Sequence, residues 1–224
     1  MTDPNPKSDP EEYRSPARIR ETYDDIATHF AKTRACPWPE IEAFLGGVGG
    51  GRGLDVGCGN GRHLGPLAAR TDRAVGVDLS RGLLAIARER LAASSRVALL
   101  QGDARALPVA DGVVDVALYV ATLHHLPSRE WRRASLDELA RVLTSGGVAL
   151  VSAWSTAHDR FDTTTDAETG FDTTVDWTLP GGETVPRFYH IYAPAEFEAD
   201  LDASALTVES TEVSSGNCYA RVRA

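Results

Sequence analysis

Between residues 53 and 154, short apolar runs alternate with segments of helical periodicity. The alternation of strand and helix patterns at this spacing is typical of a parallel sheet that helices cover on both faces. The pattern therefore predicts an α/β fold. The expected strands are residues 53–56, 74–77, 96–101, 114–120 and 148–154, and the expected helices are residues 60–69, 81–92 and 128–143.

The chain before this region has a different character. Residues 1–15 are mostly Pro, Asp, Glu, Lys and Ser, which predicts a flexible tail followed by a single domain over residues 16–224. Apolar positions at helical spacing predict one helix over residues 18–32 and a second over residues 40–45. The glycine-rich run at 46–51 then connects this leader to the first strand.

The chain after residue 154 is expected to begin with a long loop or lid. Residues 155–185 are rich in Thr, Asp and Gly and have no apolar period, and loops of that length are usually functional or disordered. A short helix over residues 194–201 follows, and two alternating strands turning at residues 214–217 predict a terminal hairpin.

Composition narrows the class of protein. The 224 residues carry 23 Lys plus Arg against 32 Asp plus Glu, a formal charge of -9, and 42% of them are hydrophobic, as in a globular domain. No stretch approaches the roughly 18 apolar residues that a membrane span needs, and the N-terminus lacks a signal peptide's basic and apolar regions. We therefore expect a cytoplasmic protein that does not enter a membrane.

Charge and cysteine usage add three expectations. The three Cys residues form no CxxC or Cys/His pairing, so neither a disulfide framework nor a metal site is predicted. The acidic balance disfavours broad phosphate contacts but allows a local set of arginines around one site. Only Lys7 and Lys32 are lysines, which is typical of salt-accumulating organisms such as halophilic archaea, with a GC-rich genome as the alternative.

The run Leu54-Asp55-Val56-Gly57-Cys58-Gly59-Asn60-Gly61 lies where the first strand turns into its helix. Glycines at alternate positions allow a tight turn and let a ligand approach a helix N-terminus. A dinucleotide site of the GxGxxG kind is disfavoured because Arg62 stands where its third glycine is required. The acidic residue followed by GxGxG instead resembles the first motif of class I S-adenosylmethionine (SAM)-dependent methyltransferases.

Two acidic residues strengthen this resemblance, since both lie at strand ends, where ligands bind in open parallel sheets. In such enzymes Asp78 would bind the ribose diol and Asp103 the adenine amino group; taken singly, each is also a common N-cap or turn residue. The resemblance implies SAM as cofactor and a seven-stranded, mostly parallel Rossmann-like sheet with an antiparallel last strand. The implied cofactor-binding residues are Asp55, Gly57, Gly59, Gly61, Asp78, Asp103 and Ala104.

The chain also resembles a narrower family, the tRNA wobble-uridine methyltransferases that esterify 5-carboxymethyluridine. The pieces that carry this resemblance span nearly the whole chain after the tail, and the Arg187-to-Tyr192 run is more specific than the glycine motif. The chain departs from the family at one segment that packs against the substrate: of the family's Asp-Asn-Trp-Trp-like end, only Asn217 is present, within Gly216-Asn217-Cys218-Tyr219. The matching pieces are Tyr23 to Phe30, Thr33-Arg34, Pro37-Trp38-Pro39, Leu54 to Arg62, His124-His125, Trp154 and Val185 to Tyr192.

The chemistry that this resemblance implies is simple. A carboxylate is ionised at pH 7, so methyl transfer to it needs no general base, only cations and donors that position it. Arg187 is the expected carboxylate clamp, because a guanidinium matches a carboxylate bidentately. The candidate catalytic set is Arg34, His125, Arg187, Tyr189 and His190. His124 and His125 as turn residues, and Tyr189 as an ordinary strand residue, are the structural alternatives.

The strand predicted at residues 96–101 is apolar and would lie at the sheet edge, where it invites pairing by another chain. The resemblance implies that this other chain is a small zinc-binding activator subunit, giving a heterodimer, and that the substrate is the tRNA anticodon loop. Two rival functions remain open: methylation of a small molecule such as a quinone or lipid precursor, and a non-catalytic SAM-fold scaffold that binds RNA.

Overall fold

The computed structural model describes residues 14–161 and 168–224. The predicted tail therefore lies outside the described residues, apart from Arg14 and Ser15. Ser15 caps the first helix, α1 (Pro16–Thr33), because its side-chain oxygen accepts a hydrogen bond from the Arg18 N–H. The helix α2 (Pro39–Gly46) follows, with Pro39 at its first position.

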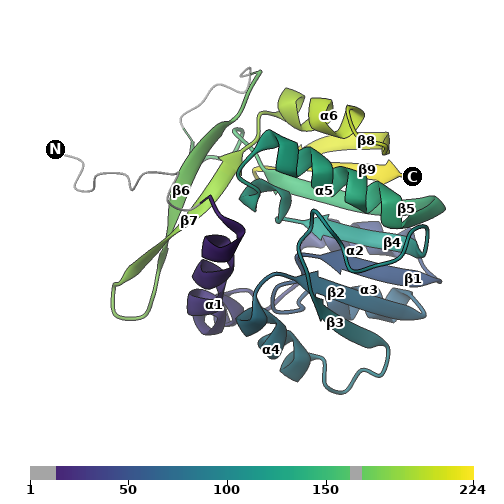
Figure 1. Ribbon diagram of the computed structural model, residues 1–224, viewed down its shortest axis with the longest axis horizontal. Coiled ribbons are helices and arrows are strands. Elements are labelled where there is room, and N and C mark those ends of the chain that lie inside the picture. Colours follow the sequence, from purple (N-terminus) through teal and green to yellow (C-terminus); the bar gives the residue numbers. More distant parts are fainter. Residues whose placement is uncertain (1–13, 162–167) are drawn as a thin grey trace.

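A seven-stranded sheet forms the centre of the molecule (Figure 1). Its strands are β1 (Arg52–Val56), β2 (Arg73–Asp78), β3 (Val97–Gln101), β4 (Val114–Val120), β5 (Leu143–Trp154), β8 (Thr207–Ser214) and β9 (Asn217–Arg223). Their order is β3-β2-β1-β4-β5-β9-β8, and β9 pairs antiparallel with both of its neighbours. The predicted mostly parallel sheet with its antiparallel last strand is confirmed, and β3 lies at the edge.

Helices pack on both faces of the sheet. The helices α5 (Arg129–Val142) and α6 (Pro194–Asp202) cover one apolar core, which includes Tyr119 and Tyr192. On the opposite face α2 and α3 (Leu64–Arg70) cover a second core that includes Leu118. The helix α4 (Arg81–Arg90) begins at Ser80, whose side chain caps it, and packs against α1.

The segment expected to be a long loop, residues 155–185, contains a strand instead of remaining irregular throughout. The strand β6 (Phe171–Thr178) pairs antiparallel with β7 (Thr184–Ile191) in a separate two-stranded sheet. Several positions of β6 carry Asp and Thr, so the segment shows no run of apolar residues and was not predicted as a strand. Val175 and Trp177 are nevertheless buried. Figure 1 shows this hairpin beside α1, beyond the carboxyl ends of the parallel strands.

Candidate active site

A cavity of about 970 Å³ opens at the carboxyl ends of the parallel strands. Its walls come from α1, the glycine turn after β1, the ends of β2 and β3, the short helical turn η2 (Leu123–His125) and the β6–β7 hairpin. The cavity therefore joins two parts of the chain that carry different chemistry. One end holds the glycines and aspartates, and the other holds arginine, histidine and aromatic side chains.

The glycine turn requires glycine at more than one position. Gly57, Gly59 and Gly61 have φ values of +72°, +52° and +75°, in the region that other residues rarely adopt. A Cβ on Gly57 would lie 2.0 Å from the Thr122 Oγ1, whereas one on Gly59 would find only Phe30, 4.0 Å away. Gly57 thus allows β1 and β4 to approach each other, and Gly59 leaves its backbone open toward the cavity.

Asp78 holds the turn in place from the end of β2. Its two carboxylate oxygens accept hydrogen bonds from the N–H groups of Gly59 and Ser80, each at 2.8 Å. Burial nevertheless raises the pKa of Asp78 to about 6, because those bonds only partly offset the loss of water. The carboxylate lines the cavity and retains capacity to accept further hydrogen bonds.

Asp55 is buried in β1 without a complete set of partners. Burial, together with the nearby charge of Asp78, raises the pKa of Asp55 to about 7. Its Oδ2 atom has no hydrogen-bond partner among the described residues. Asp55 does not itself line the cavity but lies beside the cavity-lining Val56. Its unpaired oxygen and the remaining acceptor capacity of Asp78 suit a ligand that carries an ammonium group and a ribose diol.

Asp103 and Ala104 follow β3 and also line the cavity. Asp103 is paired with Arg105, whose Nη2 lies 2.6 Å from the Asp103 Oδ2. The Arg105 guanidinium lies 3.8 Å from the centre of the Trp131 ring, so this ion pair is held against an aromatic wall. Neither Arg105 nor Trp131 was predicted from the sequence as a cavity residue.

At the other end of the cavity, Arg187 is a buried cation. Its side chain lines the cavity with 7% of the residue exposed, and its Nη1 donates to the Tyr189 hydroxyl at 2.7 Å. The Nε has no partner, and within residues 14–161 and 168–224 no ion pair joins Arg187 to a carboxylate. The guanidinium also lies 4.8 Å from the centre of the Trp177 ring. This arrangement suits an anionic ligand.

His125 is fixed beside Arg187 in a defined tautomer. Its Nδ1 lies 3.0 Å from the Phe188 carbonyl oxygen, which can only accept, so Nδ1 carries the proton. In the neutral ring Nε2 then accepts from the Tyr23 hydroxyl, at 2.8 Å. Burial lowers the pKa of His125 to about 3, so the ring is neutral at pH 7 and orients its neighbours without transferring a proton.

The remaining candidates separate into cavity and non-cavity positions. Arg34 lies at the cavity with its guanidinium 5.5 Å from the centre of the Trp177 ring. His190, in contrast, is not among the cavity-lining residues, because it lies on the side of β7 that faces Asp172 and Glu196. The geometry thus brings together Arg34, His125, Arg187 and Tyr189 and leaves His190 behind them.

Two further residues organise the cavity without having been predicted as site residues. The Trp177 Nε1–H donates to the His29 Nδ1 at 3.0 Å, which ties the hairpin to α1. Asn60 donates to the Arg34 carbonyl oxygen at 2.9 Å, which ties the glycine turn to the end of α1. Asn60 stands inside the glycine motif, so its position was visible in the sequence although its role was not.

Other kinds of site find no support in the described part of the chain. No group of three or more His, Cys, Asp or Glu residues is placed to bind a metal ion there. Among the helices of residues 14–161 and 168–224, none is long and apolar enough to span a membrane.

A methyltransferase-domain family model matches residues 54–147 of the chain. The Encephalitozoon cuniculi protein named putative methyltransferase is 33% identical over 178 residues, which cover 78% of this chain and 80% of that protein. Among solved structures, the DhpI–SAH complex superposes with a TM-score of 0.71 at 20% identity, covering 94% of this chain and 97% of that one.

Two relatives carry more specific names. The mouse tRNA (carboxymethyluridine(34)-5-O)-methyltransferase ALKBH8 is 39% identical over 138 residues, 61% of this chain and 20% of that protein. The Saccharomyces cerevisiae tRNA (carboxymethyluridine(34)-5-O)-methyltransferase is 33% identical over 171 residues, which cover 75% of this chain and 59% of that protein. The chain thus spans between about a fifth and three fifths of these two relatives.

The sheet order, the glycine turn and the acidic residues at the ends of β1, β2 and β3 together define a Rossmann-like domain with a site for a nucleoside-containing cofactor. The 80% coverage of the Encephalitozoon relative and the matching domain model identify the kind of domain. The chain belongs to the SAM-dependent methyltransferase family.

Proposed function

We propose that this methyltransferase transfers the methyl group of SAM to the carboxylate of 5-carboxymethyluridine at the tRNA wobble position, forming the methyl ester. The observation that carries this proposal is the buried Arg187, which faces the cavity without a carboxylate partner among the described residues. The mouse and yeast relatives named for this reaction support the same substrate.

The residues around Arg187 suit a carboxylate nucleophile. Such a nucleophile is ionised at pH 7, so no group has to remove a proton, and the neutral, doubly hydrogen-bonded His125 fits that requirement. Arg187 would bind one carboxylate oxygen and leave the other free to attack. Attack forms the oxygen–carbon bond as the sulfur–carbon bond breaks, and the positive sulfonium and negative carboxylate both become neutral. A buried site favours a step that removes charge.

Aromatic side chains would hold the uracil ring beside the clamp. Trp154 and Trp177 both line the cavity, and the Trp154 ring centre lies 5.1 Å from that of Tyr189. Stacking on such rings is the usual way in which proteins bind an unstacked base of single-stranded RNA. Arg34 lies at the same end, where it would meet the nucleotide's phosphate or the carboxylate.

The cofactor end would hold SAM through the predicted residues. Asp78 would accept from the ribose hydroxyls, Asp55 would favour the ammonium group, and Asp103 would bind the adenine amino group beside Arg105. Gly57, Gly59 and Ala104 line the cavity and would supply backbone contacts. Gly61 does not line it; a Cβ there would lie 2.9 Å from the Leu91 Cδ1 and 3.2 Å from the Ala87 Cβ, so this glycine lets the turn pack against α4. When bound, SAM supplies the activated methyl group, and the chain supplies position and exclusion of water.

We further propose that a small zinc-binding activator subunit pairs with β3, so that the cytoplasmic active form is a heterodimer. The β3 edge is unpaired in the described chain, and Leu100 on it is 38% exposed. One chain of the solved complex between the Haloferax volcanii Trm112 methyltransferase activator and a putative methyltransferase has a similar fold, with a TM-score of 0.67 at 16% identity over 92% of this chain and 97% of that one.

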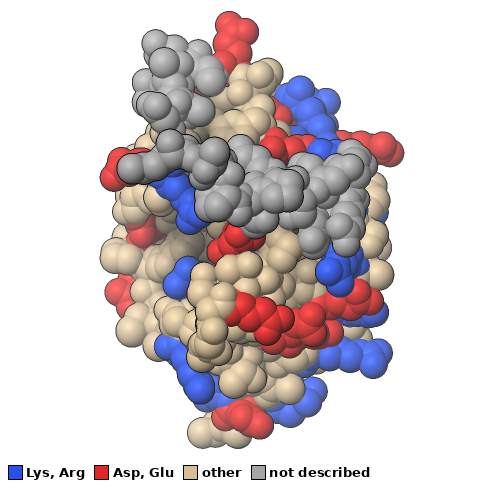
Figure 2. Space-filling view, turned by 90° about the vertical axis from the view of Figure 1, so that its left-hand side faces the viewer, with Lys and Arg blue, Asp and Glu red and all other residues tan. Residues whose placement is uncertain are grey.

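The surface charge is consistent with local rather than extensive contact to tRNA. Figure 2 shows acidic and basic side chains interspersed on one face rather than gathered by sign. With a net charge of -9, the chain lacks the excess of cations that would attract a whole tRNA. Binding would therefore rely on the flipped base, the carboxylate and the partner's surface.

A methyl-transfer assay tests the proposal, with tRNA that carries 5-carboxymethyluridine and with or without a candidate activator. We expect Arg187→Ala to lower transfer at least about a hundredfold while SAM affinity stays within about twofold. Arg73→Ala, at an exposed position at the start of β2, is the matched control and should leave both unchanged. Transfer to unmodified tRNA, or only to a small molecule, would contradict the proposed substrate.

A further inference from the structure

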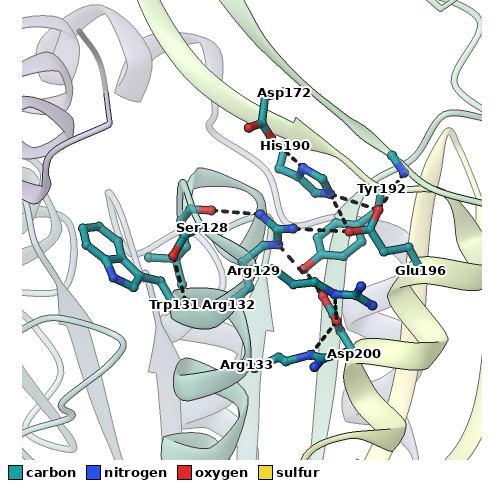
Figure 3. A network of polar contacts seen from close by, with 12 residues as sticks. Ser128, Arg129, Trp131, Arg132, Arg133, Asp172, His190, Tyr192, Glu196 and Asp200 are labelled. Atoms are coloured by element: carbon teal, nitrogen blue, oxygen red, sulfur yellow. Dashed lines mark hydrogen bonds and ion pairs between the residues drawn. The ribbon is translucent and has the colours of Figure 1, made fainter. Parts of the chain in front are cut away.

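A buried network of charges lies behind the strand that carries Arg187 (Figure 3). The His190 Nδ1 lies 2.7 Å from the Asp172 Oδ1 on β6, and its Nε2 lies 3.1 Å from the Glu196 Oε1 on α6. Arg132 of α5 binds the same Glu196 oxygen at 3.3 Å. His190 thus connects the hairpin to α6, and through Glu196 to α5.

The strand β7 separates this network from the cavity. Arg187 and Tyr189 line the cavity, whereas Phe188 and His190 do not, as expected from the alternation of side chains along a strand. Arg187 and Tyr189 are both residues of β7, so their backbone moves with the hairpin. Any movement of the hairpin relative to α6 would therefore displace both of them together.

The contacts of His190 define its protonation state. Both ring nitrogens face carboxylate oxygens, and an ionised carboxylate only accepts, so both nitrogens must donate. Burial would lower the pKa of His190, but its hydrogen bonds to Asp172 and Glu196 outweigh burial and raise the pKa above its ordinary value. The pKa of Glu196 falls to about 2, chiefly because the His190 bond outweighs burial.

Other charged and titratable groups surround His190 and its two carboxylate partners. Arg132 and His124 oppose the positive charge, although the buried His124 has a pKa well below its ordinary value and is neutral. On the far side of Asp172, Arg14 binds that carboxylate at 2.5 Å, and the Tyr192 ring lies 4.7 Å from the imidazole. Two carboxylates in direct contact decide the balance in favour of the imidazolium.

We propose that the protonated His190 is a positioning residue: it holds the β6–β7 hairpin against α6 and thereby fixes Arg187 and Tyr189 in the cavity. This positioning role rests on the proposed function in one respect only, namely that the ligand of Arg187 is the substrate carboxylate. Loss of the proton removes one N–H donor, so either Asp172 or Glu196 loses a hydrogen bond while remaining a partly buried carboxylate.

The sign of the pH dependence follows from this. A histidine whose pKa is raised by folding stabilises the structure fully below its unfolded pKa of about 6.5 and ceases to do so as pH rises through the folded pKa. The hairpin should therefore loosen on the alkaline side. Neutralising either carboxylate should move that transition to lower pH by about one unit or more, since each stabilises the imidazolium.

The first measurements use the full chain and need no substrate. NMR titration of the imidazoles would give the His190 pKa, with His190→Gln identifying its signal. Hydrogen–deuterium exchange of β6 and β7, corrected for the intrinsic effect of pH, would report the hairpin. We expect exchange to rise at least tenfold as pH passes the His190 pKa, at a lower pH in Glu196→Gln and Asp172→Asn. Glu198→Gln, an exposed neighbour on α6, should leave the midpoint unchanged.

In His190→Gln the rise of hydrogen–deuterium exchange with pH should disappear. KM for the substrate should then no longer change with pH on the alkaline side, while SAM affinity stays constant. A His190 pKa at or below about 6.5 would overturn the proposal. So would an unchanged exchange midpoint in Glu196→Gln, even if His190→Gln failed to fold. If the hairpin behaves as expected but tRNA is not methylated, the proposed function fails and the positioning role stands.

Discussion

The Arg187 guanidinium donates a hydrogen bond to the hydroxyl of Tyr189, two residues along the same strand, at 2.7 Å. The bond holds the cation at one orientation on the cavity side of β7, beneath Trp177. Tyr189 is itself held, since its ring stacks on His124 with centres 4.9 Å apart. The proposed clamp is therefore a preorganised pair rather than a single flexible arginine.

Tyr189→Phe removes the acceptor and keeps the ring. Because a buried bond to a charged group contributes about 1.5–3 kcal/mol, kcat/KM for the carboxylate substrate should fall roughly 10- to 150-fold, with SAM affinity unchanged. Tyr119→Phe is the control, since its hydroxyl donates to Ser135 in the core and does not line the cavity. That variant should lose thermal stability but not kcat/KM, and an equal loss in both would contradict the role of Tyr189.

Cofactor binding should release protons near neutral pH. The pKa values of Asp55 and Asp78, about 7 and about 6, are raised by burial, so part of each group is protonated at pH 6.5. A ligand that donates to these carboxylates favours their ionised forms, so SAM affinity should weaken as pH falls below about 6. Isothermal titration at pH 6.5 in buffers of different ionisation enthalpy would measure the release.

Asp78→Asn should reduce both the affinity and the proton release. Asp103→Asn is the matched comparison: its hydrogen bonds to Arg105 outweigh burial and keep the pKa of Asp103 below its ordinary value, so this carboxylate is already ionised at pH 6.5. Proton release should survive in that variant even where affinity falls. Binding that takes up protons would be inconsistent with the assignment of Asp78.

The same raised pKa values make a prediction for the protein without cofactor. A carboxyl group whose pKa is higher in the folded than in the unfolded state favours folding at low pH, and that contribution is lost as pH rises through about 6 to 7. Between pH 5 and pH 8 the contribution of these two groups to stability should therefore decrease, and Asp55→Asn should flatten the dependence. Thermal melts across that range would show it.

Gly57 and Gly50 share a positive φ, at +72° and +78°, but differ in their surroundings. Alanine at either position should cost about 1–2 kcal/mol for the left-handed backbone. A Cβ on Gly57 would also meet Thr122, whereas one on Gly50 has open space. Gly57→Ala should therefore lose SAM binding as well as stability, and Gly50→Ala only stability, as melting curves and cofactor titrations of both variants would show.

The partner surface can be tested by matched charges on the two edges of the sheet. Leu100 on β3 and Val213 on β8 are both exposed apolar residues, at 38% and 48%. Leu100→Asp should weaken binding of an activator subunit at least tenfold in a pull-down or titration, because a charge is placed in the pairing surface. Val213→Asp should not, and equal effects of both would argue against pairing at β3.

The cofactor end of the site was predictable from the sequence because its signals are local. Asp55 and the three glycines lie within seven residues, and Asp78 and Asp103 directly follow apolar strands, so sheet topology alone brings them together. The alternation of strand and helix predicted a parallel sheet, whereas the edge position of β3 was expected from the resemblance to class I methyltransferases. What the sequence did not show is that Asp103 is occupied by Arg105, since an ion pair two residues apart leaves no periodic pattern.

The substrate end was only partly predictable, because it depends on contacts between distant segments. Arg187 and Tyr189 were identified through a family motif, but that motif does not distinguish the two faces of β7, and His190 was grouped with them. Trp177 belongs to a polar segment without a hydrophobic period, and it becomes a cavity residue only because β6 pairs with β7 and because His29 accepts its N–H.

The β6–β7 hairpin has a consequence for how this domain can diverge. Within the described residues, neither β6 nor β7 pairs with a strand of the seven-stranded sheet, and one bridge joins Ser155, directly after β5, to Tyr192, directly after β7. The residues that would hold the cofactor lie at the ends of strands of the large sheet, whereas Trp177, Arg187 and Tyr189, half of the six residues that would recognise the substrate, lie on the small one. Exchanging the hairpin is therefore a route to a new methyl acceptor that leaves the methyl donor's site intact.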